Sequence, residues 1–365
     1  MSKKLKSIAI IGTNGIPARY GGFETLAEYL TKELGERYNF FVYCSSIYSK
    51  SERRSKFNNS RLFYIPLKAN GLQSIFYDVV TTFHAWFKYD ILLVLGPSAG
   101  FMLPLNRIFG KKLIVNCGGL DEWKREKFSL LQKAMVITNF KFATKSSSFN
   151  IADNEPLKKS LKKKFNVESE VISYGGDHIQ ISKITDALIS KYSFLSGQYD
   201  LSISRAQEDN NLHLVLETYK SVKSRNLVLI SNWGISEYGR NLKKEYNGKY
   251  SNIVLLDAVY DVNLLNVFRS NTSLYIHSHS RCGTAPSLVE AMNYNIPIIS
   301  FDVETNRLTT KNKTLYFSSI SDLKSVLNSL SVNELRRIKT EMFKIAKQEY
   351  TWQIVANNYA NLFDN

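Results

Sequence analysis

The sequence is poor in the residues that build disulfide frameworks and metal centres. Its 365 residues include three cysteines, Cys44, Cys117 and Cys282, and five histidines. The cysteines are odd in number and far apart, which argues against a disulfide framework and against a cysteine-rich metal site. Because no acidic cluster accompanies the few histidines, we expect neither a metal nor another cofactor.

Long hydrophobic runs are also missing. The apolar run behind the basic start, Ile8 to Ile11, is much shorter than the core of a signal peptide. The longest uncharged apolar stretch, residues 91–105, is too short for a bilayer and is interrupted by two glycines and two prolines. We therefore expect no membrane-spanning segment and a cytoplasmic location.

Acidic residues are in deficit. The chain has 32 Asp and Glu against 48 Lys and Arg, which gives a formal net charge of +16. This excess indicates an acidic partner, which could be nucleic acid, an anionic lipid surface or a phosphorylated substrate. With 44% hydrophobic and 22% charged residues the chain is an ordinary globular protein. Its length predicts two domains of comparable size.

Short apolar runs alternate with helix-period segments along the chain. The runs are almost continuously apolar, as in strands that are buried on both faces of a parallel sheet. Strand-helix alternation predicts doubly wound α/β domains. The expected strands are 7–13, 40–45, 61–67, 90–96, 112–119, 149–154 and 171–176, followed by 199–205, 226–231, 252–258, 272–278 and 296–303.

A polar segment separates the two series of strands. We expect a Rossmann-like N-terminal domain over residues 1–180, a junction over 181–197 and a second Rossmann-like domain over 198–350. A final helix, 351–365, can pack back on the first domain. Two such sheets that face each other place the carboxyl ends of their strands on either side of one cleft. Functional residues are therefore expected in the loops that follow the strands.

The first such loop is rich in glycine. Residues 12–24 read "GTNGIPARYGGFE". Glycines let the backbone approach a ligand closely, and the free N–H groups of the helix after Gly22 attract an anion. The guanidinium of Arg19 suits a diphosphate. The spacing matches neither a dinucleotide fingerprint nor a P-loop, so the loop is either a site for a phosphate or phosphorylated sugar or a tight strand-to-helix turn.

A second loop leads into a helix that we expect to start at Pro286, a residue favoured in the first helical turn. Thr284 and Ser287 can cap this helix or extend the anion site at its N-terminus. One turn into the helix, Glu290 can accept two hydrogen bonds from a ribose diol or can simply be solvated. Asn295 stands where the helix must end, a place for left-handed backbone.

Two strand ends in the second half carry candidate side chains. His277 and His279 lie at the end of one strand, and we expect them to point to opposite faces if the strand reaches that far, so that one faces the ligand. Arg205 ends the first strand of this half, well placed to neutralise a leaving diphosphate. The alternative for this arginine is a surface ion pair with Glu208 or Asp209.

The segment "CGGLDEWKREKF", residues 117–128, follows the fifth strand. Asp121 and Glu122 are candidate ligand-facing carboxylates with basic residues such as Arg125 beside them, although such a mixed group can also be a solvated helix start. Trp123 can be a platform for a sugar or a packing anchor.

A basic helix face is predicted from the five lysines between residues 158 and 164. Most such runs are only solvated. This one lies in a half rich in aromatic residues, including Trp86, Phe87, Phe101 and Phe109. A basic and aromatic surface suits contact with anionic lipid without insertion.

The chain resembles GT-B glycosyltransferases of family 4, and its N-terminal half resembles the bacterial rhamnosyltransferases that build capsule and cell-wall polysaccharides. The resemblance spans nearly the full length. It rests on "IIGTNGIPARYGGFETLAEYL", "EWKREKF", "IADNE", "ISYGGD", "YIHSHSRCGTAPSLVEAM" and "FDVETNRLTT". The first motif is long and specific, whereas the "PSLVEAM" type occurs throughout the wider family. The implied fold is GT-B, with two Rossmann-like parallel-sheet domains that face a central cleft.

The resemblance implies retaining, metal-independent transfer from a nucleotide sugar. We expect L-rhamnose to move from dTDP-L-rhamnose to a lipid-linked oligosaccharide, in surface polysaccharide synthesis at the inner face of the bacterial plasma membrane, with no nucleic acid partner. Glu290 matches the ribose-binding glutamate of the family and Arg205 its diphosphate-binding arginine. Catalysis would stabilise the leaving diphosphate while the acceptor hydroxyl attacks from the same face.

The site residues expected on this basis form three groups. The catalytic candidates are Arg205, Asp121 and Glu122. The donor-binding candidates are Gly21, Gly22, Arg205, Asn210, His279, Gly283, Thr284, Ala285, Ser287 and Glu290. The acceptor-side candidates are Arg19, Glu24, Trp123 and Arg125.

The sequence also departs from the family pattern. The wider family has a glutamate eight residues before Glu290, where this chain has Cys282, and a lysine five residues after the arginine, where it has Asn210. The rhamnosyltransferase-like subgroup shares both losses. An aspartate expected in "NCGGLDEW" is replaced by Gly118. Two enzyme alternatives therefore stay open, a UDP- or GDP-hexose donor and a sugar-nucleotide epimerase, as does a non-catalytic basic protein that binds nucleic acid or membrane.

Overall fold

The computed structural model describes residues 5–19, 21–71, 73–124 and 128–365. The chain divides into two compact units, Met1–Tyr174 together with Trp352–Asn365, and Gly175–Thr351. The C-terminal helix thus belongs to the first unit, and the segment expected as the junction, 181–197, lies within the second. No helix among the described residues is long and apolar enough to cross a membrane.

The first unit is built on a sheet that, in its described residues, has eight strands in the order β3-β4-β2-β1-β5-β6-β7-β8. All neighbours pair in parallel except β3 and β4. The strand order reverses direction between β1 and β5. The strands are β1 Ser7–Ile11, β2 Asn39–Cys44, β3 Lys56–Phe57, β4 Ser60–Tyr64, β5 Ile91–Leu95, β6 Lys112–Asn116, β7 Phe149–Ala152 and β8 Glu170–Val171.

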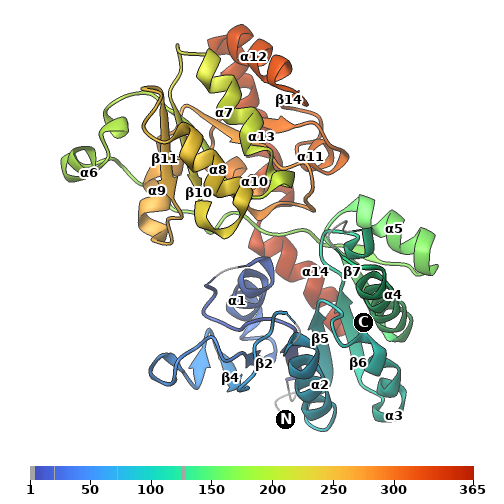
Figure 1. Cartoon of the computed structure of the whole chain (residues 1–365). Coiled ribbons are helices and arrows are strands. Elements are labelled where there is room, and N and C mark those ends of the chain that lie inside the picture. The colour runs from blue at the N-terminus through green and yellow to red at the C-terminus, as the bar shows by residue number, and fades with distance from the viewer. Residues whose placement is uncertain (1–4, 20, 72, 125–127) are drawn as a thin grey trace. The chain divides into compact units, whose positions relative to one another are not determined.

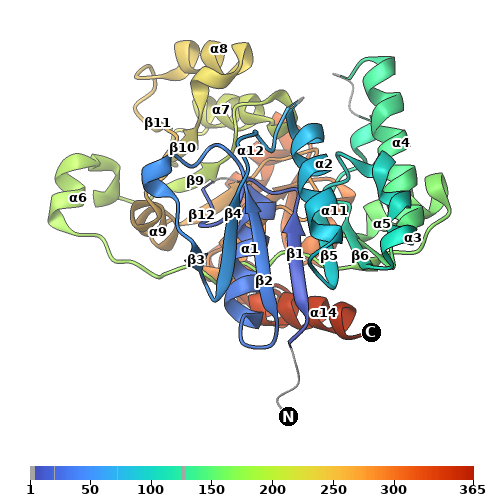
Figure 2. The ribbon, with the colours of Figure 1, turned by 90° about the horizontal axis from the view of Figure 1, so that it is seen from below.

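Helices cover both faces of this sheet. Helices α1 and α14 lie side by side, and the rings of Tyr29 and Trp352 stack with centroids 4.5 Å apart. Helices α2, α3, α4 and α5 gather on one side of the unit (Figures 1 and 2), over a core that contains Trp86 and Phe140. The helices are α1 Gly22–Leu34, α2 Gln73–Trp86, α3 Asn106–Phe109, α4 Leu130–Ser146, α5 Glu155–Phe165 and α14 Trp352–Asp364, with short turns η1 Lys50–Glu52, η2 Gly100–Leu105 and η3 Glu122–Lys124.

The second unit is built on a parallel sheet with the order β11-β10-β9-β12-β13-β14 among the described residues. This is the strand order of a dinucleotide-type Rossmann sheet, and the order reverses between β9 and β12. Ligands of such sheets bind beyond the carboxyl ends of the strands at this switch point. The strands are β9 Asp200–Ile203, β10 Leu227–Ser231, β11 Ile253–Asp257, β12 Leu274–His277, β13 Ile298–Phe301 and β14 Leu315–Phe317.

The helices of the second unit start at side-chain caps where the sequence provides Ser, Thr or Asp. Ser236 accepts a hydrogen bond from the N–H of Gly239 at the start of α8, and Asp261 caps α9 in the same way. The helices are α6 Asp186–Lys191, α7 Leu212–Ser221, α8 Glu237–Tyr246, α9 Val262–Ser270, α10 Pro286–Asn293, α11 Glu304–Thr309, α12 Ile320–Ser329 and α13 Val332–Glu349, with short turns η4 Ser193–Ser196, η5 Glu208–Asn210 and η6 Trp233–Ile235.

The α/β fold and the alternation of strands and helices are as predicted. The strand expected over 171–176 is confined to β8, Glu170–Val171, because the two glycines after Tyr174 continue as irregular backbone. The short strands β3 and β14 were not predicted. Both lie at the edge of their sheets and have only two or three residues, which is too short a run to show the pattern of a strand.

Candidate functional site

Arg205 lies two residues beyond β9, at the switch point of the second sheet, and is exposed. The arginine ion pairs of this unit involve Arg225, Arg269, Arg307 and Arg337, and none of those among the described residues involves Arg205. The alternative of a surface ion pair with a neighbouring carboxylate is therefore not seen. The guanidinium is available to an anion at the carboxyl end of the sheet.

Asn210 joins the loop after β9 to the loop after β12. Its side chain is buried, and its amide nitrogen donates to the carbonyl of Arg205 at 2.7 Å. Its own carbonyl accepts a hydrogen bond from the hydroxyl of Ser278 at 2.6 Å. Because these bonds involve the backbone of both loops, we assign Asn210 a positioning role for Arg205 in place of a donor contact.

Helix α10 begins at Pro286, as the sequence predicted. Ala285 occupies the N-cap position, so neither Thr284 nor Ser287 supplies a side-chain cap. Pro286 has no N–H, and the N–H groups of Leu288 and Val289 donate to the carbonyl of Ala285 at 3.0 and 3.2 Å, so the N–H of Ser287 is the donor that this helix start can offer to an anion. Thr284 is buried, and Gly283 and Ser287 are partly buried. The predicted left-handed backbone at Asn295 is confirmed, with φ 55°.

Glu290 is not a solvated residue of α10. One of its carboxylate oxygens lies 2.5 Å from the guanidinium of Arg269, and the other lies 3.4 Å from Nε2 of His178. Burial alone would raise the pKa of Glu290, but the charge of Arg269 and the contact with His178 outweigh it and lower the pKa to about 2. The site thus holds a charged, oriented carboxylate one turn into the helix.

No motif in the sequence points to Arg269 or His178. The motif "ISYGGD" was interpreted as a strand, whereas its glycines let the chain run against α10. A Cβ atom on Gly176 would lie 2.5 Å from the carbonyl oxygen of Val289. This close approach brings His178, two residues later, to Glu290. Arg269 lies in the last turn of α9 and belongs to no motif, so only the fold reveals its role.

The expectation that His277 and His279 point to opposite faces is wrong. Their ring centroids are 4.3 Å apart. Residues two apart on a strand lie on the same side, and although β12 ends at His277, the backbone beyond it keeps the two rings together. Burial lowers the pKa of His279 to about 4, with a further contribution from the charge of Arg205. Both imidazoles are therefore neutral at physiological pH, since burial also lowers the pKa of His277.

The glycine-rich loop of the first unit folds around a buried carboxylate. Glu24 accepts hydrogen bonds from Nδ2 of Asn14 at 2.7 Å and from the backbone N–H of Asn14 at 3.3 Å. Gly21 has φ 124°, and a Cβ atom there would lie 2.2 Å from Oε2 of Glu24. A Cβ atom on Gly22 would lie 3.0 Å from the hydroxyl of Tyr174. In the first unit Glu24 therefore shapes the loop, a structural role in place of the acceptor contact expected of it.

Arg19 is also engaged within the first unit. Its guanidinium pairs with Glu52 at 2.5 Å and lies 4.4 Å from the centroid of the Tyr48 ring. These contacts hold the loop against the segment that follows β2. An anion would have to displace Glu52 to reach this guanidinium, which makes Arg19 a weaker anion ligand than the exposed Arg205.

Of the two roles considered for Trp123, the structure supports the packing anchor. Its ring is buried and meets the rings of Phe140 and Phe165 edge-on, at centroid distances of 5.0 and 5.1 Å. A ring enclosed in this way offers no face to a sugar within the first unit, which favours the packing role over the acceptor-side role that was predicted for it.

Asp121 and Glu122, the two acidic residues that precede Trp123, are partly buried. Asp121 forms an ion pair with Lys124 and accepts a hydrogen bond from Ser160 at 3.4 Å. Glu122 begins the turn η3. Arg125 lies outside the described residues.

Two buried carboxyl groups of the first unit had escaped sequence analysis. Burial raises the pKa of Asp78, on α2, and of Asp153, directly after β7, to about 8 each. Asp153 belongs to "IADNE", a motif noted only for its family resemblance. Asp78 sits among apolar residues of α2, where nothing in the sequence distinguishes it from a solvated residue.

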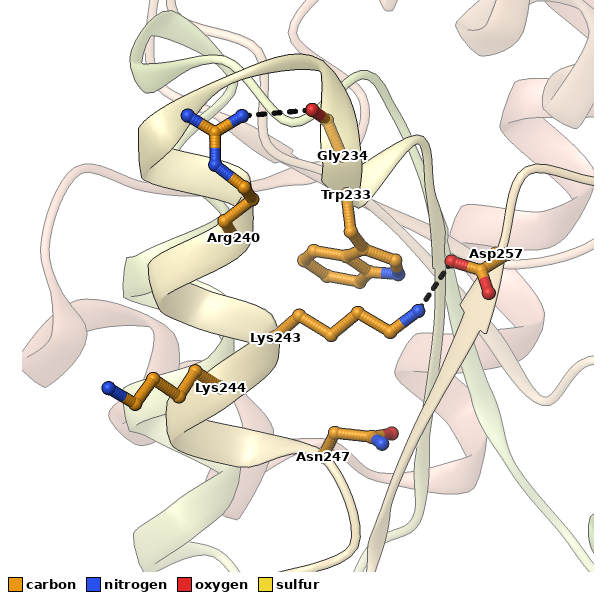
Figure 3. A pocket seen from close by; sticks show the side chains of 7 residues that line it. All are labelled: Trp233, Gly234, Arg240, Lys243, Lys244, Asn247 and Asp257. Atoms are coloured by element: carbon orange, nitrogen blue, oxygen red, sulfur yellow. Dashed lines mark hydrogen bonds and ion pairs between the residues drawn. The ribbon is translucent and has the colours of Figure 1, made fainter.

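A pocket of about 550 Å³ lies on the second unit beside β10 and β11 (Figure 3). It is basic, but two of its three cationic side chains are already bound to other lining residues. Arg240 donates to the carbonyl of Gly234 at 3.0 Å, and Lys243 pairs with Asp257 at 2.7 Å. The lining residues are Trp233, Gly234, Arg240, Lys243, Lys244, Asn247 and Asp257. The pocket belongs to the β10–β11 side of the sheet and contains none of the predicted site residues.

Comparisons with known proteins agree with this architecture. The sequence model of a family described as "Domain of unknown function (DUF1972)" matches residues 5–177. No curated protein matches the sequence.

Several solved structures share the fold over almost the whole chain. Sucrose-phosphate synthase from Thermosynechococcus elongatus matches with a TM-score of 0.78 at 15% identity, covering 98% of each chain. Anabaena HepE in complex with UDP and glucose matches with a TM-score of 0.74 at 14% identity, covering 98% of this chain and 99% of its own. A glycosyltransferase from Rickettsia africae matches with a TM-score of 0.74 at 11% identity, covering 99% and 98%. The chain therefore has the GT-B fold, with a Rossmann-like parallel sheet in each unit.

Proposed function

We propose that the protein is a glycosyltransferase whose second unit binds a nucleoside-diphosphate sugar at the carboxyl ends of β9 and β12. The observation that carries the proposal is the exposed Arg205, which has no ion pair among the described residues, at the switch point where Rossmann-like sheets bind ligands. A diphosphate leaving group develops negative charge, and a fixed guanidinium at that point stabilises it.

Two further features support a nucleotide at this place. The start of α10 offers the backbone N–H of Ser287, which no side chain caps and which suits a phosphate. The Glu290 carboxylate is held charged by Arg269 and His178, so it can accept hydrogen bonds from a ribose diol through its remaining lone pairs. Together these groups supply cationic, N–H and carboxylate partners for the three parts of a nucleoside diphosphate.

For the reaction itself we propose retaining transfer without a required metal. Arg205 and the helix start would take the charge that a metal carries elsewhere, while the acceptor hydroxyl attacks the face from which the diphosphate leaves. The sequence resemblance favours L-rhamnose from dTDP-L-rhamnose as donor and a lipid-linked oligosaccharide as acceptor. The HepE structures, solved with UDP, with UDP and glucose and with UDP-glucose, favour a UDP-hexose as the second candidate.

A donor panel tests the proposal. Melting temperatures are measured with dTDP, dTDP-rhamnose, UDP, UDP-glucose, GDP and GDP-mannose, because a ligand that binds only the folded state stabilises it. A shift confined to dTDP compounds supports rhamnose, and a shift with UDP compounds supports the second candidate. Release of free nucleoside diphosphate during turnover separates transfer from epimerisation, which changes the sugar and releases none.

A matched pair of variants tests the role of Arg205. Arg205→Ala should lower turnover by about 10²–10³-fold at saturating donor while the melting temperature stays unchanged. Arg240→Ala, an arginine of the same unit whose guanidinium donates to a backbone carbonyl, should keep full turnover. Equal activity of the two variants would remove Arg205 from the mechanism.

We also propose that the first unit docks on an anionic membrane surface, where a lipid-linked acceptor would lie. Of the aromatic residues expected on this surface, Phe87 and Phe101 are exposed. The expectation is corrected for the other two, because Trp86 is buried and Phe109 stacks on it. Other large apolar side chains are exposed on the same helices. They are Phe76, Val80 and Phe83 on α2, Leu105 on η2, Ile108 on α3, and Leu130, Leu131, Met135 and Phe142 on α4.

These helices pack against one another. Phe109 of α3 contacts Trp86 and Phe87 at the end of α2, and a Cβ atom on Gly100 of η2 would lie 2.0 Å from a carbonyl of α4. The lysines of α4 and α5, including the exposed Lys141 and Lys145, add positive charge. Apolar side chains beside lysines are the composition of an interfacial membrane contact.

Vesicle co-sedimentation tests this surface. The full chain should bind vesicles that contain phosphatidylserine and should bind pure phosphatidylcholine vesicles weakly. Leu130→Ser/Leu131→Ser should weaken binding severalfold, whereas Val332→Ser, at an equally exposed apolar residue of the second unit, should not. Loss of binding in the control variant alone, or equal binding of all variants, would contradict the assignment.

A further inference from the structure

Three side chains with metal-binding atoms meet at the end of β12. They are His277 on the last residue of the strand, His279 just beyond it, and Cys282 in the loop that leads to α10. One ligand atom from each of them, two ring nitrogens and the sulfur, lies within 4.8 Å of the other two. The cluster combines the strand end with the loop, so the fold and not the sequence spacing brings it together.

The ring nitrogens of this cluster lack the partners that buried polar atoms normally have. His277 is 1% exposed, and neither of its ring nitrogens has a hydrogen-bond partner with ordinary distance and angle among the described residues, although the side chain of Asn306 interacts with this imidazole. Nε2 of His279 also has none there. Buried polar atoms are almost always bonded to protein or to an ordered group. Unpartnered nitrogens beside a thiol therefore point to a ligand that accepts lone pairs.

We infer that His277, His279 and Cys282 form a binding site for a thiophilic divalent cation of the Zn²⁺ type. Two imidazoles and one thiolate are a ligand set that Zn²⁺ prefers, and no carboxylate belongs to the set, which disfavours Mg²⁺ and Ca²⁺. In a tetrahedral zinc site the ligand atoms lie about 3.3–3.6 Å apart. The three atoms need to close by at most about 1.5 Å, which rotation of the side chains can supply.

The surroundings of the cluster fit this assignment. Sγ of Cys282 lies 3.2 Å from Oδ1 of Asn306, a fully buried side chain. The amide nitrogen of Asn306 donates to the carbonyls of His279 and Phe301, both at 3.0 Å, so its oxygen is fixed toward the thiol. This oxygen is placed to be a fourth ligand.

The site adjoins the proposed donor site, since the charge of Arg205 acts on His279 and Cys282 lies in the loop that leads to α10, but its role differs from the transfer chemistry proposed above. That chemistry assigns the diphosphate to Arg205 and α10 and needs no metal, so a bound Zn²⁺ would not be its catalyst. The metal-binding test therefore uses no nucleotide and no sugar, and its outcome does not depend on whether the donor assignment is right.

Zinc binding is measured directly on the full chain. The protein is stripped with a chelator and dialysed, and Zn²⁺ is titrated in competition with a chromophoric indicator. The expected result is one tightly bound equivalent per chain. Cys282→Ser and His279→Gln should each weaken this affinity by about 100-fold. Cys117→Ser, a buried thiol in the first unit that belongs to no such cluster, should leave it unchanged.

Two further measurements guard against a variant that simply misfolds. Zn²⁺ should raise the melting temperature of the wild type and of Cys117→Ser but not of Cys282→Ser, and Mg²⁺ should raise none of them. Co²⁺ in place of Zn²⁺ should give a thiolate-to-metal absorption band that is lost in Cys282→Ser. Absence of a bound equivalent in the wild type, or equal Zn²⁺ affinity of wild type and folded Cys282→Ser, would overturn the assignment.

Discussion

The ion pair between Arg269 and Glu290 allows the sharpest test of the candidate site. Both side chains are almost fully enclosed, at 11% and 16% exposure. Arg269→Met keeps the length of the side chain and removes its charge, so Glu290 is left buried with His178 alone. Breaking a buried pair on one side costs about 3–5 kcal/mol. For a domain the size of the second unit this lowers the melting temperature by roughly 6–20 °C.

The pH dependence gives the same magnitude independently. The folded-state pKa of Glu290 is depressed from 4.5 to about 2. Its contribution to stability is therefore present above the ordinary carboxyl pKa and is lost as the pH falls from about 4.5 to about 2. At about 1.4 kcal/mol per pKa unit, the contribution at neutral pH is about 3 kcal/mol. Arg269→Met should remove most of this acid-dependent loss.

Calorimetry of a double-mutant cycle separates the pair from its parts. The cycle contains wild type, Arg269→Met, Glu290→Gln and the double variant, with Arg240→Met as a surface control that should be near neutral. The double variant should be at least about 1 kcal/mol more stable than the sum of the single effects predicts. Additive effects, or a loss below about 1 kcal/mol in Arg269→Met, would refute the reasoning that Arg269 holds Glu290 in its charged state.

Three predictions concern the first unit. The pKa of Asp78 is raised to about 8, so this group lowers the stability of the fold as the pH rises from about 4 to 8. The melting temperature of Asp78→Asn should therefore exceed that of wild type by a margin that widens with pH. Parallel plots of melting temperature against pH for the two proteins would contradict this. Gly21→Ala should destabilise the unit by about 1–3 kcal/mol in urea unfolding because its Cβ would meet Glu24. Gly71→Ala, also at positive φ but with open space around it, should lower the free energy of unfolding by less. Equal losses in the two variants would exclude the contact with Glu24 as the cause. Trp123→Ala should cost about 3–5 kcal/mol in the same assay, and unchanged stability with lost turnover would restore the sugar-platform role.

Local rules were sufficient for much of the fold and for the backbone of the site. The continuous apolar runs predicted the central strands. A strand that is buried on both faces is apolar at almost every position, and this pattern can be recognised without knowing which strands lie beside it. The start of α10 at Pro286 and the left-handed Asn295 follow from the fixed φ of proline and the tolerance of asparagine for positive φ. These features depend on one or two neighbouring residues, which a sequence shows directly.

The partners of the site side chains could not be predicted in this way. Arg269 and Glu290 are 21 residues apart, and His178 reaches Glu290 only because Gly176 packs against α10. The register that brings His277, His279 and Cys282 together depends on where β12 ends. Trp123 has the same residue type whether it packs or binds, and only the rings of the neighbouring helices decide between the two.

The distribution of engaged and available charge explains why the donor is assigned to the second unit. In the loop after β1, Glu24 is bound to Asn14, and Arg19 is bound to Glu52. An anion that binds there must first break an existing pair, which costs part of the affinity it gains. In the second unit Asn210 binds the carbonyl of Arg205 and leaves its guanidinium exposed. A charge that is positioned through its backbone but unpaired at its tip is preorganised for an incoming diphosphate, since no protein contact has to be given up.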